Sequence, residues 1–149
     1  MEIADPITSV LAGKSSELWT TSPSASVFEA IQQMGERNVG ALPVIERSKL
    51  VGIVSERDYT RKVILMGKSS KDTEVGSIMT TSLVTIKGSD TVARSLQTMS
   101  EKRVRHLPVM EGEDLVGIVT IGDLVKWVIS AQGAIISQLE GYIQGGYPG

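Results

Sequence analysis

The chain contains no cysteine and only one histidine among its 149 residues. The absence of cysteine excludes disulfide bonds, thiol nucleophiles and cysteine metal sites, and it is compatible with any redox compartment. A single histidine leaves too few partners for most nucleophile–base pairs and for histidine-rich metal sites. We therefore expect no catalytic residues, no metal site and no enzyme activity.

Long apolar runs and a large excess of one charge are also missing. No apolar run reaches the roughly 18 residues that a helix needs to span a bilayer. The formal net charge is -2 at pH 7, so no strongly basic face is available for DNA or RNA. The first residues, MEIADPITSVLAG, lack the apolar core of a secretory signal. We expect a cytoplasmic protein that binds neither membrane nor nucleic acid, or one of an organelle matrix if a targeting segment has been removed.

What the chain does contain is an internal repeat. The motif GIVSERD at Gly52–Asp58 returns as GIVTIGD at Gly117–Asp123, 65 positions later. At this offset Leu18–Ile64 aligns without a gap on Leu83–Ile129, and roughly two in five aligned residues are identical. Hydrophobic residues make up 41% of the chain and charged residues 21%, as in soluble globular proteins. The sequence therefore indicates two copies of one folding unit.

Each copy predicts the order β-α-β-β-α. Apolar residues recur at helical spacing in the first helix of each copy: Val27, Ala30, Ile31 and Met34, and then Val92, Leu96 and Met99. Ser24 and Ser89 are predicted to cap these helices, because a serine hydroxyl can accept an amide hydrogen at a helix start. The runs ALPVI and HLPVM, each followed by a polar turn and LVGIV, predict hairpins. A second helix is expected at 57–66 and at 123–131. The fold class is α+β, of α/β type, with pseudo-two-fold symmetry.

These elements suggest a division of the chain into five segments. We expect a lead-in with a helix at 1–17, one repeat at 18–66, a polar linker at 67–82 and the other repeat at 83–131. The remaining residues, 132–149, are expected to form a helix and a flexible tail. An apolar stripe on that helix requires burial, and a two-fold homodimer is the commonest solution.

The repeated motif places a hydroxyl residue at a strand-to-helix junction and an aspartate three residues later. The pairs are Ser55 with Asp58 and Thr120 with Asp123. One interpretation is a capping box, with an acidic residue suited to the helix dipole. Another is a ribose-phosphate cradle, in which amides and a hydroxyl bind phosphate while the carboxylate accepts from sugar hydroxyls. Glycine on the preceding strand would allow a ligand or another backbone to approach closely. The two roles are compatible.

The runs VGALPVIERSKLVGIVSERD and VRHLPVMEGEDLVGIVTIGD resemble the cystathionine-β-synthase (CBS) domain family, over Leu18 to about Ala131. A G-h-x-[S/T]-x-x-D signature with an upstream LPV run, present twice at equal spacing, is far more specific than either motif alone. The whole chain is similar to stand-alone two-repeat CBS proteins of bacteria and plant organelles.

The resemblance implies that adenosine-containing ligands bind in the cleft between the repeats. AMP or ATP is expected first, with ADP, NAD and S-adenosylmethionine as further candidates, as a regulatory ligand and not as an obligatory cofactor. The chain would then be a non-catalytic energy or metabolite sensor for an unidentified effector protein. By position, Asp58 and Asp123 would hold ribose hydroxyls, and Ser55 and Thr120 would contact ribose or phosphate. The other residues implied to line the ligand are Thr20, Val39, Gly40, Ala41, Leu42, Pro43, Arg57, Thr85, Arg103, Arg105, His106, Leu107, Pro108 and Gly122.

The two copies differ in charge. Gly40 and Ala41 are replaced by Arg105 and His106 in the second copy, and Arg57 loses its charged counterpart. This difference predicts one cleft suited to a polyphosphate and another that binds with different affinity or stays empty. The alternative is that the arginines are solvated surface charges and the histidine is structural. Protonation of His106 near neutral pH would otherwise modulate anion affinity.

Two other functions are compatible with the sequence. The chain could be an architectural dimerisation module with vestigial clefts, or an enzyme that processes nucleotides. Titration with adenosine compounds separates a sensor from an architectural module, and turnover of the same compounds would identify an enzyme.

Overall fold

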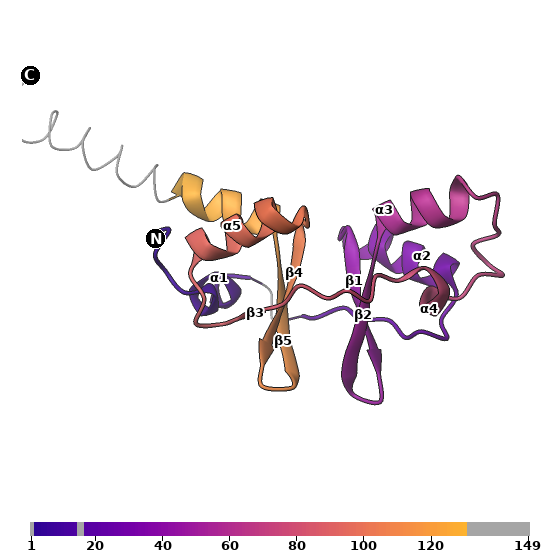
Figure 1. Cartoon of the computed structure of the whole chain (residues 1–149), viewed down its shortest axis with the longest axis horizontal. Coiled ribbons are helices and arrows are strands. Elements are labelled where there is room, and N and C mark those ends of the chain that lie inside the picture. Colours follow the sequence, from indigo (N-terminus) through magenta and orange to yellow (C-terminus); the bar gives the residue numbers. More distant parts are fainter. Residues whose placement is uncertain (1, 15–16, 131–149) are drawn as a thin grey trace, which may run out of the picture. The chain divides into compact units, whose positions relative to one another are not determined.

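The computed structural model describes residues 2–14 and 17–130, and these form two compact units (Figure 1). One unit contains residues 17–85 and 110–116. The other contains 2–14, 86–109 and 117–130 of the described chain.

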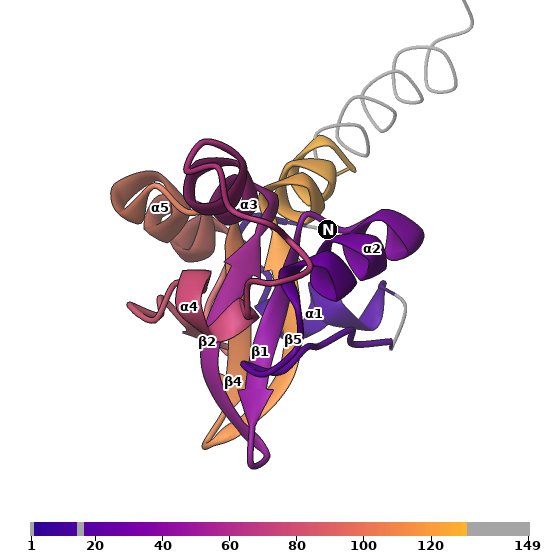
Figure 2. The same ribbon diagram turned by 90° about the vertical axis from the view of Figure 1, so that its right-hand side faces the viewer.

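The unit that holds the first repeat is built around a two-stranded antiparallel hairpin. Figure 2 shows helices α2, α3 and α4 around this hairpin. Its elements are α2 (Val27–Arg37), β1 (Ala41–Glu46), β2 (Lys49–Ser55), α3 (Glu56–Tyr59), the π-helical turn η1 (Thr60–Ile64) and α4 (Val75–Ile78). The extended stretch expected before α2 is reduced to a parallel bridge between Thr21 and Val44.

The second repeat has the same order of elements. They are β3 (Ile86–Lys87), α5 (Val92–Lys102), β4 (His106–Glu111), β5 (Asp114–Thr120) and a helix over residues 121–130. The strands form one sheet in the order β3-β4-β5. Helix α1 (Ile7–Ala12), from the lead-in, belongs to this unit. The predicted α+β fold with a repeated β-α-β-β-α order is therefore confirmed.

The predicted helix caps are wrong by two residues in both repeats. Ser26, not Ser24, caps α2, and its hydroxyl accepts the amide hydrogen of Glu29. Thr91, not Ser89, caps α5 in the same way. In each repeat a hydroxyl residue directly precedes the first buried valine of the helix. The register of that apolar stripe therefore decides which hydroxyl lies within reach of a free amide.

Equivalent apolar residues fill the two cores. Val27, Met34, Leu42, Val44 and Val54 are buried in the first unit, and each has a buried counterpart in the second. Those counterparts are Val92, Met99, Leu107, Val109 and Val119. Of the residues that the helical periodicity named, Ile31 and Leu96 are half-buried and the others are buried. Ser95 is buried where the first repeat has Ala30, and its hydroxyl donates to the carbonyl of Thr91.

The polar segment between the repeats contains a short helix that contributes to a core. Val75 and Ile78 of α4 are fully buried against the apolar residues of the first repeat. The same offset of 65 positions that relates the repeats also relates Val75 to Val10, which is buried on α1. Helices α1 and α4 are therefore equivalent elements that precede the two repeats.

The helix predicted at 57–66 begins as a regular α-helix and then becomes irregular. Helix α3 lasts for four residues and continues as the π turn η1, which buries Val63. A π turn inserts one residue per turn, which periodicity alone does not predict. The helix expected at 132–143 and the tail lie outside the described residues.

We expect Ile78→Ala to lower the free energy of unfolding by about 2–5 kcal/mol, because it removes a buried side chain and leaves a cavity. Urea titration followed by circular dichroism measures the loss. Lys68→Ala, at an exposed position of the same segment, should change the free energy by less than about 0.5 kcal/mol. Equal effects of the two substitutions would show that α4 does not belong to the core.

Candidate functional site

The strand-to-helix corner of the first repeat is closed by reciprocal hydrogen bonds. Ser55 ends β2 and caps α3, and its Oγ accepts the amide hydrogen of Asp58 at 3.1 Å. In return, Asp58 Oδ2 accepts the amide hydrogen of Ser55 at 3.0 Å. This arrangement is a capping box, which satisfies two amides that a helix start leaves without intrahelical partners.

The corner of the second repeat has the same geometry. The amide of Asp123 donates to Thr120 Oγ1 at 3.0 Å, and the amide of Thr120 donates to Asp123 Oδ2 at 2.9 Å. The capping interpretation of the repeated motif is therefore confirmed at both corners. The cap binds each carboxylate through one oxygen, and this bond fixes the orientation of the carboxylate at the end of the strand.

A backbone bond brings the start of the hairpin to each corner. The amide of Glu56 donates to the carbonyl of Gly40 at 3.0 Å, and the amide of Ile121 donates to that of Arg105 at 2.9 Å. Predicted site residues that are distant in sequence therefore meet in space. In the first repeat these are Gly40, Ser55 and Asp58.

The glycine of each repeated motif is required by a helix-bearing segment that packs on the strand. A Cβ at Gly52 would lie 2.7 Å from Met79 Sδ, and a Cβ at Gly117 would lie 2.8 Å from a methyl of Leu11. Met79 follows α4, and Leu11 lies on α1. The sequence predicted a close approach of a ligand or another backbone at these glycines, and side chains of the segments that carry α4 and α1 occupy that space.

Asp58 is nearly surrounded by hydrogen-bond donors. It is 7% exposed, and besides the cap it accepts from Ser55 Oγ at 3.1 Å and from Thr80 Oγ1 at 3.2 Å. Lys62 Nζ lies 3.1 Å from Asp58 Oδ1 and also donates to the carbonyl of Ile78 at 2.8 Å. A buried carboxylate needs such partners, because an unpaired charge in the interior is costly.

Asp123 has fewer partners and is more accessible. Its side chain is 23% exposed, and Oδ2 accepts from the amide of Thr120 and from Lys14 Nζ, the latter at 2.6 Å. Lys14 also donates to the carbonyl of Ile118 at 2.9 Å. Among the residues that the structure describes, no donor is bonded to Asp123 Oδ1.

The two lysines were not predicted, and they come from different places. Lys62 lies on the helix that carries Asp58, one turn further along. Lys14 comes from the lead-in, more than 100 positions before Asp123. Spacing of four residues on a helix could have revealed Lys62. Lys14 could have been found only by extending the repeat backwards to the equivalence of α1 and α4.

The other predicted site residues differ in accessibility. Ala41, Leu42, Pro43, Leu107 and Pro108 are buried, so their backbone atoms would have to serve a ligand. The residues with exposed side chains are Arg57, Thr85, Arg103 and Arg105, and Gly122 is also exposed. Thr20, Val39 and His106 are half-buried. Arg103 also ends α5 in the left-handed region, with φ 54°, as Asn38 ends α2.

Burial lowers the pKa of His106 below its ordinary value, because the interior disfavours the imidazolium form. The negative charge of Asp123 opposes this effect, while Arg105 and Lys14 add to it. The histidine is therefore held in its neutral form beside the second corner. In the first repeat Ala41 occupies this position.

Neither a metal cluster nor a membrane-spanning helix is present in the described part of the chain. Residues 2–14 and 17–130 hold no group of three or more His, Asp and Glu side chains placed to bind a metal ion. No helix in these ranges is long and apolar enough to cross a membrane.

A family model for the CBS domain matches residues 14–64 and 75–130. The chain belongs to the CBS-domain family. The first matched segment begins at Lys14, after α1, and the second begins at Val75, the first residue of α4. A tandem CBS pair is a regulatory module.

Relatives match most of the chain. The mitochondrial CBS domain-containing protein CBSX3 of Arabidopsis thaliana is 43% identical over 143 residues, which is 91% of this chain and 69% of that protein. A solved protein with CBS domains from Burkholderia ambifaria MC40-6 is 40% identical, with a TM-score of 0.83, over 86% of this chain and 96% of that one. The CBS domain pair of MJ0100, solved with 5-methylthioadenosine and S-adenosylmethionine, shares the fold at 24% identity, with a TM-score of 0.77, over 86% and 98%.

We expect the stability of this CBS pair to fall as the pH drops below about 6.5, the pKa of histidine in an unfolded chain. The pKa of folded His106 is lower, so the unfolded chain binds more protons below that pH and is favoured. The stability that neutral His106 contributes is fully present above about pH 6.5 and is lost as the pH falls towards the pKa of His106 in the folded protein. Urea unfolding at about pH 7.5 and 5.5 measures the difference. His106→Ala, which installs the residue of the first CBS repeat, should lose less stability between these two pH values than the wild type. An equal loss would show that His106 does not cause the pH dependence.

The two capping aspartates should differ in their effect on stability. Asp58→Asn should cost about 2–4 kcal/mol, because it leaves buried donors and Lys62 without their charged acceptor. Asp123→Asn should cost about 1 kcal/mol, since its ion pair is more exposed to water. Denaturant titration of both variants provides the comparison. A larger loss at Asp123 would refute the ranking based on burial.

Proposed function

We propose that this CBS pair is a sensor that binds an adenosine-containing ligand through its strand-to-helix corners and signals to a partner protein. AMP and ATP are the first candidates, and ADP, NAD and S-adenosylmethionine follow. The ligand acts by favouring one conformation of the pair, which alters a surface that the partner contacts. We further propose that the chain acts as a homodimer.

The observation that carries this proposal is the accessible carboxylate of Asp123. A carboxylate offers about four lone-pair sites for hydrogen bonds, and the described chain uses two of them at Asp123. Adjacent ribose hydroxyls are donors that match the remaining sites. Thr120, Arg105 and His106 surround the same corner and would serve the rest of a nucleotide.

The first corner is less open to a sugar, because Asp58 already accepts from Ser55, Thr80 and Lys62. A ribose there must replace bonds that the fold has made. We therefore expect the second corner to bind more tightly. The complex of the MJ0100 pair with two adenosine compounds supports the ligand class through the shared fold.

An architectural module is the second candidate. The saturation of Asp58 favours it for the first repeat, because a carboxylate with a complete set of internal partners needs no ligand. If both corners were structural, the pair would assemble with partners but bind no nucleotide.

We expect Asp123→Ala to weaken binding of the preferred adenosine ligand tenfold to a hundredfold, because a hydrogen bond to a charged acceptor contributes about 1.5–3 kcal/mol. Isothermal titration calorimetry with AMP, ATP, NAD and S-adenosylmethionine identifies that ligand and measures the loss. Asp114→Ala, at an exposed hairpin position, is the matched control. Unchanged affinity in a folded Asp123→Ala protein would leave Asp123 as a helix cap alone.

A further inference from the structure

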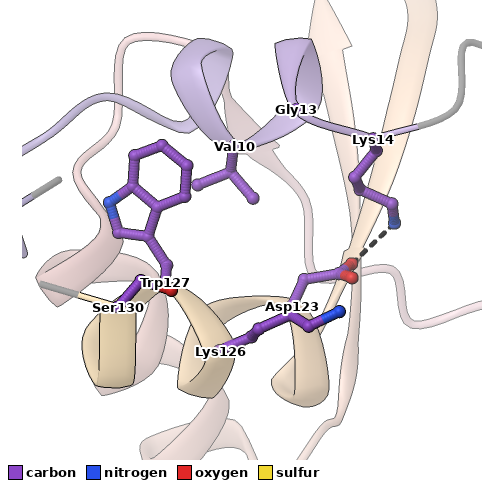
Figure 3. A pocket seen from close by; sticks show the side chains of 7 residues that line it. All are labelled: Val10, Gly13, Lys14, Asp123, Lys126, Trp127 and Ser130. Carbon is purple, nitrogen blue, oxygen red and sulfur yellow. Dashed lines mark hydrogen bonds and ion pairs between the residues drawn. The ribbon is translucent and has the colours of Figure 1, made fainter. Parts of the chain in front are cut away.

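A hollow of about 340 Å³ lies beside Asp123, between α1 and the helix at 121–130. Val10 and Trp127 form its apolar wall, and Lys14, Lys126 and Asp123 supply its charged groups. In the view of Figure 3, the Lys126 ammonium is drawn toward the end that holds Lys14 and Asp123, and Trp127 lies at the other end. The indole nitrogen donates to the carbonyl of Glu2, so Trp127 is fixed in place.

The Lys14 ammonium is held but not saturated. It carries three hydrogens, and the described partners are Ile118 O and Asp123 Oδ2. Its side chain is 30% exposed, so the third hydrogen can reach a ligand. Lys126 is exposed and forms no ion pair with any residue in the described ranges. Two cations and one carboxylate give the hollow a net positive charge.

A sugar at Asp123 would share the carboxylate with Lys14. Ribose hydroxyls can donate to the sites on Asp123 that no described donor uses, while Lys14 keeps its bond to Oδ2. A neutral nucleoside offers the third hydrogen of Lys14 no charged acceptor, whereas a phosphate on the same molecule does. A charge-assisted hydrogen bond from Lys14 therefore favours a nucleotide over a nucleoside.

We propose that this hollow is an anion subsite, in which Lys14 and Lys126 bind the phosphate chain of the adenosine ligand and select phosphorylated ligands over neutral ones. The inference rests on the function proposed above and adds the ligand's charge class. Lys14 is then a specificity-determining residue contributed by the lead-in.

The first repeat offers no equivalent arrangement. Met79 stands at the position of Lys14, and Lys62 at that of Trp127. Lys62 is already bound to Asp58 and to the carbonyl of Ile78. Of the two lysines in the hollow, Lys126 alone has a cationic counterpart in the first repeat, which is Arg61. Charge selection is therefore assigned to the second repeat.

The test compares adenosine, AMP, ATP and inorganic tripolyphosphate by calorimetry on the full chain and on Lys14→Met, which installs the residue of the first repeat. Loss of one charged contact should weaken ATP binding tenfold or more. Adenosine affinity should stay within about threefold, because a neutral nucleoside makes no charged contact with Lys14. Lys126→Met should weaken ATP to a smaller extent, because an exposed lysine is screened by water. Lys102→Met, at an exposed position on α5, should leave the affinities for all four compounds unchanged.

Each possible result either supports the anion subsite or refutes it. A selective loss of ATP and tripolyphosphate in Lys14→Met supports the subsite. If adenosine and ATP bind the wild type and weaken equally in the variant, the subsite is refuted while the sensor function stands. If ATP binding is unchanged in Lys14→Met, the subsite is refuted in the same way. If no adenosine compound binds the wild type, the sensor function fails and the inference fails with it.

Discussion

The reciprocal hydrogen bonds between a hydroxyl residue and an aspartate at each strand-to-helix corner are the constraint on which the rest of the structure depends. They end the strand, start the helix and fix a carboxylate at the junction. A carboxylate held there must be neutralised, because burial without a counter-charge is costly. Each repeat meets this requirement with a lysine, Lys62 in the first and Lys14 in the second.

Each lysine also ties its corner to the segment that carries α4 or α1. Lys62 binds the carbonyl of Ile78 in α4, and Lys14 is itself part of the lead-in that follows α1. The glycines of the repeated motif, Gly52 and Gly117, let these same segments pack on the strands. Capping, packing and charge therefore meet at one place in each repeat.

The two corners have diverged within a shared geometry. Asp58 is buried and has a complete set of donors, which suits a structural role. Asp123 is partly exposed, has an oxygen without a described donor and lies beside a cationic hollow. A duplicated fold can thus keep one copy for stability and leave the other available for recognition. In this CBS pair the lysine lies on the aspartate's own helix in the first repeat and on the lead-in in the second.

The duplication, the β-α-β-β-α order, the apolar stripes of the first helices and the family could be predicted from the sequence alone, because these depend on local periodicity and on motifs at a fixed spacing. It predicted the helix caps two residues early, because Ser24 and Ser26 are both suitable until packing sets the helix register. The π turn, the burial of α4 and the pairing of Lys14 with Asp123 were decided only by the tertiary structure. Each depends on which distant segments pack together, and no local pattern encodes that choice.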